Sequence, residues 1–160
     1  MSLEIEQKFL VLDNTFISKS HKKQFIKQGF LNSNKNRTVR IRILDSQGFI
    51  TIKGLSNKSG TTRFEWEKEI PLNEAETLLL LAEHSPIEKH RYLVKNNELT
   101  FEVDVFEGAN KGLIIAEIEL NREDDVFHKP NWLGPEVTGD VKYYNSSLSN
   151  FSYDKWTKKT

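Results

Sequence analysis

The chain has 160 residues, and its 23 basic residues balance its 23 acidic residues, so no overall charge marks it as a nucleic-acid or membrane binder. It has no cysteine, which excludes disulfides and thiolate metal sites and leaves oxygen or imidazole as metal ligands. No apolar run approaches the ~20 residues of a spanning helix, and a signal-peptide core is missing at the start. We therefore expect a single domain over residues 1–160, cytoplasmic and without a membrane partner.

The predicted elements are mostly strands, recognised by alternating polar and apolar side chains. In chain order, the sequence predicts a strand over 3–11, a helix over 15–28 that ends near Gly29, strands over 38–43 and 49–53 joined by a hairpin turn, and a strand over 62–70. These are followed by a helix over 74–84 with Asn73 as its N-cap, strands over 87–95, 98–107 and 113–121, a short strand over 136–138, and a helical stretch over 141–149. The short connections favour an antiparallel sheet.

Charged residues of one sign recur on single strand faces. Because side chains alternate along a strand, Glu4, Glu6 and Lys8 share one face while Leu3 and Ile5 lie on the other. A solvated sheet face would explain any one such pair, but it favours mixed signs, because neighbouring like charges destabilise a sheet. The same-face groups are Glu4/Glu6/Lys8, Arg40/Arg42, Lys53, Arg63/Glu65/Glu67/Glu69, Lys89/Arg91, Glu102/Asp104 and Glu117/Glu119.

The opposite faces of these strands are apolar and must be covered. The two helices are available to cover them from outside, which turns the charged faces inward. We therefore predict an α+β protein, mainly β, in which a closed antiparallel barrel surrounds a charged tunnel. Because burying so many ions without solvent or partners would be costly, the lumen must hold water, metal and anion.

The residue types in the lumen predict its ligands. Carboxylates without Cys or clustered His favour a hard cation, Mg²⁺ or Mn²⁺, over Zn²⁺. Arg and Lys on the same lining favour a compact polyanion with phosphate oxygens. Metal together with several phosphates is the equipment of phosphoryl transfer, in which one ion holds the phosphate chain and a second activates water.

Seven elements in order resemble the CYTH superfamily, the triphosphate tunnel metalloenzymes. They are Glu4-x-Glu6-x-Lys8, Arg40-x-Arg42 with Thr51-Ile52-Lys53, Glu65-x-Glu67, Glu88-Lys89-x-Arg91-Tyr92, Glu102-x-Asp104-x-Phe106-x-Gly108, Ala116-Glu117-x-Glu119 and Val137-Thr138-x-Asp140. The resemblance implies an eight-stranded antiparallel tunnel, with 136–138 as the eighth strand.

The resemblance also implies roles for individual residues. It makes Glu4, Glu6, Asp104, Glu117 and Glu119 ligands of Mg²⁺ or Mn²⁺, with two ions expected. It implies that the substrate phosphates are bound by Lys8, Arg40, Arg42, Lys53, Lys89, Arg91 and Lys142. Among these, Lys8 and Lys89 are expected to act at the scissile phosphate.

The resemblance has two departures. Compact bacterial relatives often carry Gly-Tyr where this chain has Gly29-Phe30, so a hydroxyl is lost. Relatives often carry two adjacent basic residues in the segment that reads Asp140-Val141-Lys142-Tyr143 here.

The function predicted from the sequence is hydrolysis of a triphosphate-bearing small molecule, with inorganic tripolyphosphate the first choice. A class IV adenylate cyclase, a thiamine triphosphatase and a triphosphate sensor without turnover are the alternatives. An RNA-binding barrel is disfavoured, because acid-acid pairs repel a phosphate backbone unless metal intervenes. The oligomeric state is left open between monomer and homodimer.

Overall fold

The computed structural model describes residues 2–156, and most of its regular structure is strand. The strands are β1 (Ser2–Val11), β2 (Lys22–Asn32), β3 (Arg37–Leu44), β4 (Gln47–Gly54), β5 (Thr62–Ile70), β6 (Ile87–Asn96), β7 (Leu99–Phe106), β8 (Ile114–Glu119) and β9 (Leu133–Glu136). The helices are α1 (Thr15–Lys19), α2 (Leu72–Leu79) and α3 (Asn145–Asn150), with 3-10 turns at Gly108–Asn110, Val141–Tyr143 and Tyr153–Lys155.

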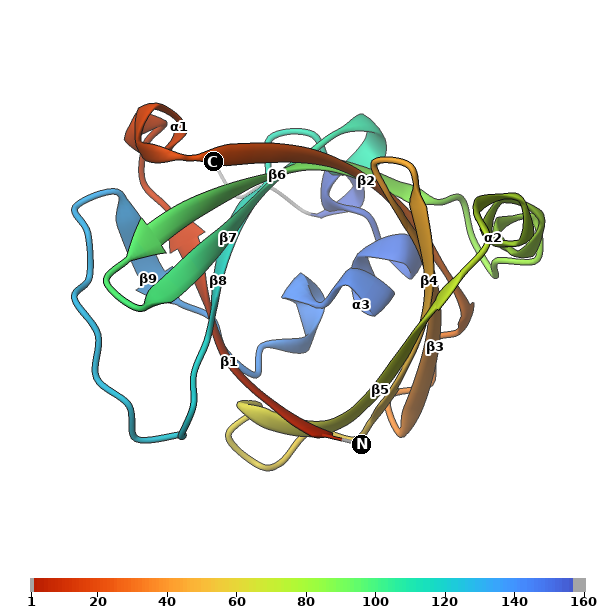
Figure 1. Cartoon of the computed structure of the whole chain (residues 1–160), viewed down its shortest axis with the longest axis horizontal. Coiled ribbons are helices and arrows are strands. Elements are labelled where there is room, and N and C mark those ends of the chain that lie inside the picture. The colour runs from red at the N-terminus through yellow and green to blue at the C-terminus, as the bar shows by residue number, and fades with distance from the viewer. Residues whose placement is uncertain (1, 157–160) are drawn as a thin grey trace.

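Strands β1 to β8 close into an antiparallel barrel (Figure 1). Neighbours follow the order β5-β4-β3-β2-β6-β7-β8-β1, and pairing of β1 with β5 closes the ring. Closure pairs Ser2–Ile5 of β1 with Thr62–Glu65 of β5, which covers part of the strand edges that could otherwise pair with another chain. The predicted closed, eight-stranded antiparallel barrel is therefore confirmed.

The predicted helix over 15–28 is wrong beyond its first turn. Helix α1 ends at Lys19, and the following segment forms β2, which pairs with β3 on one side and β6 on the other. Pairing on both sides satisfies the backbone of this segment, and such tertiary context overrides local preference. Gly29, predicted to end the helix, lies inside β2, where an added Cβ would stand 2.9 Å from Cβ of Ala82. A residue without a side chain lets the chain after α2 approach the sheet.

The eighth barrel strand is β2, so the prediction of an eighth strand at 136–138 is wrong. Strand β9 is a ninth strand that pairs with the end of β1. Beyond it, the hydroxyl of Thr138 accepts a hydrogen bond of 2.9 Å from the backbone N–H of Lys8. The segment over 137–139 is therefore held beside β1 without extending the sheet.

Helix α2 covers the outer face of β3 and β4. It begins at Leu72 after Pro71, so Asn73 lies within the first turn and is not the predicted N-cap. Its buried residues Ala75 and Leu79 pack in a cluster with Ile41, against strands whose polar residues face the lumen. At the contact, an added Cβ on Gly48 would lie 2.7 Å from Cβ of Ala75, so the glycine permits the approach.

Helix α1 covers another part of the barrel. Its Phe16 is fully buried and packs in a cluster with Phe101 and Trp132, outside β1, β7 and β8. Two of the three helices described in residues 2–156 thus lie outside, as predicted.

Helix α3 instead lies within the ring of strands (Figure 1). Its Leu148, with Tyr143 before it, joins a buried cluster with Ile87, Phe106 and Ile115 of the inward strand faces. Two residues further along β6, on the same face, the lining becomes charged. One end of the lumen is therefore filled with apolar side chains, and the other part is charged.

Candidate active site

Every barrel strand contributes at least one side chain to one cavity of about 220 Å³. The charged lumen that alternation predicts is therefore present. The basic side chains that line it are Lys8, Arg40, Arg42, Lys53, Arg63 and Arg91. The carboxylates that line it are Glu4, Glu6, Glu65, Glu67, Glu102, Glu117 and Glu119.

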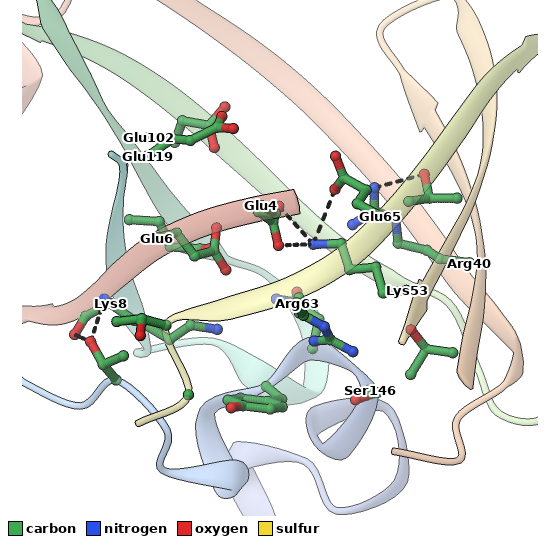
Figure 2. A pocket seen from close by; sticks show the side chains of 18 of the residues that line it. Glu4, Glu6, Lys8, Arg40, Lys53, Arg63, Glu65, Glu102, Glu119 and Ser146 are labelled. Carbon is green, nitrogen blue, oxygen red and sulfur yellow. Dashed lines mark hydrogen bonds and ion pairs between the residues drawn. The ribbon is translucent and has the colours of Figure 1, made fainter. Parts of the chain in front are cut away.

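The two kinds of charge are partly segregated around the ring. The adjacent strands β7, β8 and β1 carry Glu102, Glu117, Glu119, Glu4 and Glu6, which we call the acidic side. The arc from β6 to β5 carries the guanidinium groups and Lys53, together with Glu65 and Glu67 of β5, and we call it the basic side. In Figure 2 Glu6, Glu102 and Glu119 lie on the side of the cavity away from Arg40, whereas Glu4 lies between them and contacts Lys53. Strand order thus creates two zones for ligands of opposite charge.

Lys53 links the two sides through Glu4. Its ammonium lies 2.8 and 2.9 Å from the two carboxylate oxygens of Glu4 and 3.4 Å from an oxygen of Glu65 (Figure 2). Burial raises the pKa of Glu4, but Lys53 outweighs burial and holds the pKa below its ordinary value. Burial and the neighbouring Glu4 raise the pKa of Glu65. The negative charges of Glu4 and Glu65 are thus both stabilised by the single ammonium group of Lys53.

Glu6 and Glu117 form a carboxyl pair on the acidic side. Burial, then the charges of Glu117 and Glu4, raise the pKa of Glu6 well above its ordinary value. Burial also opposes the charge of Glu117, but Lys8 and a hydrogen bond with Glu6 lower the pKa of Glu117. The two carboxyl groups therefore titrate as a coupled pair, in which Glu6 is the member whose protonated form is favoured. This like-charge crowding is what a bound cation relieves.

The predicted metal ligands are only partly brought together. Glu4, Glu6, Glu117 and Glu119 line the cavity, whereas Asp104 does not. Within residues 2–156, no group of three or more His, Cys, Asp or Glu side chains is arranged to hold a metal ion. The donors on the acidic side are all carboxylate oxygens, the ligand type that hard cations prefer. Their chemistry fits Mg²⁺ or Mn²⁺.

The basic side contains three clustered arginines, of which Arg40 is paired with Glu67 and Arg91 with Asp104 and Glu102, whereas Arg42 has no ion pair within residues 2–156. Arg42 donates from Nε to the side-chain oxygen of Gln28 at 2.9 Å, and Arg40 donates to the hydroxyl of Thr51 at 3.1 Å. Burial, then the positive charges of Arg40 and Arg91, lower the pKa of Arg42 to about 9. The guanidinium remains charged at neutral pH, so this side retains positive charge that an anion can neutralise.

Lys8 is a basic residue on the acidic side. It is buried and stands opposite Glu117 in the pairing of β1 with β8. Burial lowers the pKa of Lys8, but the carboxylates of Glu117 and Glu6 outweigh burial and raise it. Its ammonium lies 4.9 Å from the centre of the Tyr144 ring. Lys8 is therefore a charged group that lines the cavity among the carboxylates of the acidic side.

Lys89 and Asp104 lie beneath the cavity. The Lys89 side chain is fully buried, and its ammonium is 2.7 Å from Oδ2 of Asp104. Arg91 donates to both oxygens of the same carboxylate, at 2.7 and 3.0 Å. Burial lowers the pKa of Lys89 to about 7 although Asp104 opposes the shift. Despite burial, Arg91 and Lys89 lower the pKa of Asp104.

Lys142 does not reach the site. It is exposed, and its ammonium lies 4.9 Å from the ring centre of Trp156 and 5.2 Å from that of Tyr143. Neither it, nor Lys89, nor Asp104 lines the cavity. The remaining predicted residues do line it: Glu4, Glu6, Lys8, Arg40, Arg42, Lys53, Arg91, Glu117 and Glu119.

Several lining residues were not among those predicted for the site. Those on strands have a signal, because Arg63, Glu65, Glu67 and Glu102 alternate on the same faces as predicted residues. Tyr144, Asn145 and Ser146 also line the cavity, but they follow a 3-10 turn and begin a short helix. Strand alternation gives no signal for such positions.

A sequence model of the CYTH domain matches residues 2–150. The chain therefore belongs to the CYTH domain family, in agreement with its barrel and charged lumen. It is 45% identical over 154 residues to a protein of Acetivibrio thermocellus named inorganic triphosphatase, covering 96% of this chain and 97% of the relative. It is 35% identical over 151 residues to an inorganic triphosphatase of Nitrosomonas europaea, covering 91% and 96%.

Solved structures show the same architecture. The crystal structure of an inorganic triphosphatase aligns with a TM-score of 0.65 and 32% identity, over 91% of this chain and 97% of that one. A protein from Pyrococcus horikoshii, 22% identical, shares the fold with a TM-score of 0.59, over 76% of this chain and 81% of its own. None of the helices in residues 2–156 is long and apolar enough to cross a membrane.

Proposed function

We propose that the protein is a divalent-cation-dependent inorganic triphosphatase, which releases phosphate from tripolyphosphate inside the barrel. The observation that carries the proposal is the cavity in which five of the seven lining carboxylates lie on one arc and all the guanidinium groups lie on the other. A triphosphate chain with a bound cation has both charges to match. The inorganic triphosphatases of A. thermocellus and N. europaea support the same substrate.

The basic side would hold the phosphate chain. Arg40 and Arg42 offer planar forks that match phosphate oxygens, and Arg91, already paired with Asp104 and Glu102, adds positive charge beside them; the repulsion that Arg42 experiences decreases when an anion enters. Arg63 faces the same space, with a guanidinium 5.9 Å from the Tyr144 ring. The lining contains phosphate-binding groups but few aromatic side chains for a base, which favours inorganic tripolyphosphate over a nucleotide.

The acidic side would hold Mg²⁺ or Mn²⁺. Glu4, Glu6, Glu117 and Glu119 are the proposed ligands, and the number of ions expected from the sequence is two. Glu102 lies on the same arc and is a further donor. When bound, the cation neutralises phosphate charge and lowers the pKa of a coordinated water. Asp104 is left out of this set, because Lys89 and Arg91 already occupy both of its oxygens.

Lys8 is proposed to act at the scissile phosphate. It lines the cavity beside the proposed metal ligands Glu6 and Glu117, so its ammonium can stabilise the charge on the transferred group. In the reaction, water adds to the terminal phosphorus and the bridging P–O bond breaks. The products are inorganic phosphate and diphosphate, and the proton lost by water passes to solvent or a cavity carboxylate. The same role for Lys89 stays a prediction from the sequence; because its ammonium contacts Asp104 and does not line the cavity, we propose a different role for it.

A substrate panel with Mg²⁺ and Mn²⁺ tests the proposal. Tripolyphosphate, ATP and thiamine triphosphate are supplied separately, and phosphate, diphosphate and cyclic AMP are measured for each. We expect phosphate release from tripolyphosphate to exceed release from ATP, and EDTA to abolish it. Diphosphate and cyclic AMP from ATP as main products would identify a cyclase, and binding without turnover would identify a sensor. The homodimer and the cytoplasmic location stay predictions.

A further inference from the structure

Asn145, at the start of α3, connects the inner wall of the barrel to the cavity. Its side-chain oxygen accepts two hydrogen bonds, from Nζ of Lys89 at 3.0 Å and from Nε2 of Gln28 at 3.1 Å. Lys89 and Gln28 belong to β6 and β2, which are adjacent in the barrel. Asn145 is half-buried and itself lines the cavity.

Arg42 determines which way the amide groups in this network point. A guanidinium is a donor and never an acceptor, so the Gln28 atom that receives Nε of Arg42 at 2.9 Å must be oxygen. The nitrogen of Gln28 is therefore the atom that donates to Asn145, and Asn145 must present its oxygen. This order does not depend on the protonation state of Lys89.

The amide nitrogen of Asn145 is left for the cavity. Both of its protein hydrogen bonds end on the oxygen, and within residues 2–156 the nitrogen has no hydrogen-bond partner. It is not a buried unsatisfied atom, because solvent in the cavity reaches it. A side-chain amide whose oxygen is fixed by hydrogen bonds and whose NH₂ points to the cavity is already oriented to donate a hydrogen bond to an anion.

We propose that the side-chain NH₂ of Asn145 donates a hydrogen bond to a phosphate oxygen at the inner end of the substrate. The inference rests on the proposed function and deepens it by adding a binding residue that is not a strand residue. Lys89 is then a positioning residue, because it holds the oxygen of Asn145 and does not line the cavity. The competing explanation is a purely structural bond that ties α3 to the barrel.

Asn145→Asp separates these two roles. The variant keeps an oxygen for Lys89 and Gln28, so α3 stays attached, but it replaces the NH₂ donor by a second carboxylate oxygen that repels phosphate. The matched control is Asn150→Asp, which adds the same charge at the exposed end of the same helix. We expect Asn145→Asp to melt at or above the wild-type temperature, while Asn150→Asp behaves as wild type in every assay.

Affinity is measured by calorimetry with Mg²⁺ and an imido-bridged tripolyphosphate, which resists hydrolysis. Loss of a hydrogen bond to a charged group should raise Kd roughly ten- to hundred-fold in Asn145→Asp. KM for tripolyphosphate should rise in parallel. If Asn145→Asp unfolds, Asn145→Ser, which also lacks the amide, is measured with the same expectation.

The outcomes separate this inference from the proposed function. Equal Kd values for Asn145→Asp and Asn150→Asp, with phosphate release intact in the wild type, overturn the role of Asn145 alone. A wild type that binds the analogue but releases no phosphate overturns the triphosphatase, while the ratio of Kd values still decides the role of Asn145. A wild type that does not bind the analogue overturns both.

Discussion

At the scale of single residues, the carboxyl pair of Glu6 and Glu117 gives the metal-free protein a measurable pH dependence. The pKa of Glu6 is raised by burial and by the charges of Glu117 and Glu4, so the folded state holds this proton more tightly than the unfolded chain does. A raised pKa in the folded state stabilises the fold at low pH and loses this effect as pH rises through the folded pKa. Ionised Glu6 therefore costs stability above that pKa.

Glu6→Gln should remove this cost. We expect the metal-free variant to be more stable than the wild type at pH 8, by up to about 1 kcal/mol, through relief of like-charge repulsion. The advantage should shrink as pH falls through the raised pKa of Glu6 in the folded state, and it should be small near pH 4.5, the ordinary pKa of a glutamate, where the unfolded chain is only partly ionised at this position. Urea unfolding in EDTA from pH 4.5 to 8 measures the difference. An advantage that is constant across this range would contradict the raised pKa.

Lys89, buried between Asp104 and Asn145, gives a second prediction at the scale of single residues. Lys89→Met removes one of the two bases that hold Asp104 but leaves both hydrogen bonds from Arg91. We expect a loss of roughly 1–3 kcal/mol in stability, less than for a carboxylate left wholly unpaired. Phosphate release should fall by at least about tenfold, because Asn145 loses its stronger anchor. Lys58→Met in the exposed loop is the control, and equal effects at both positions would remove Lys89 from the network.

At the scale of elements, strand patterns predicted most of the sheet but not β2. Lys22 and Lys23 precede Gln24, Phe25 and Ile26, so the start of this segment alternates poorly. Its strand conformation comes from partners distant in sequence, the edges of β3 and β6, which a local pattern does not contain. The same reason explains which residues of the candidate site could be predicted from the sequence. The residues that alternate along strands were found, whereas Asn145 and Tyr144 reach the cavity through the packing of α3.

The contact between α2 and β4 gives a prediction about packing. Gly48→Ala should destabilise the protein by about 1–3 kcal/mol, because its Cβ would lie 2.7 Å from Cβ of Ala75 and 3.0 Å from the carbonyl oxygen of Ile70. Gly54→Ala on the same strand is the matched control, since its nearest neighbour is Cβ of Phe64 at an ordinary 3.4 Å. Chemical denaturation of both variants measures the effect. Similar midpoints for the two variants would show that α2 moves freely to accommodate the methyl group.

At the scale of the whole molecule, the barrel holds more charge than its own ion pairs neutralise. Mg²⁺ and tripolyphosphate together should raise the melting temperature of the wild type, because ligands that bind the folded state stabilise it by mass action. In Glu119→Gln this rise should shrink and metal-dependent activity should be lost, because Glu119 is a proposed ligand.

The metal-free Glu119→Gln protein should be as stable as the wild type, or more stable by up to about 1 kcal/mol. The reason is that burial and the charges of Glu4 and Glu102 raise the pKa of Glu119, so its ionised form is strained by its neighbours. Thermal unfolding with and without both ligands, with phosphate release measured in parallel, tests this. Retained activity with an unchanged thermal shift would exclude Glu119 from the metal site.

The apolar packing of Leu148 and Tyr143 against Phe106 and Ile115 has a consequence for how substrate enters and products leave the barrel. Because this packing closes one end of the lumen, substrate must enter and both products must leave through the opposite end. A linear polyphosphate then enters by one end, and it is hydrolysed from that terminal phosphate while the rest of a longer chain stays outside the barrel. Cyclic trimetaphosphate has no tip to insert, and should be left untouched at concentrations where the linear chain is consumed.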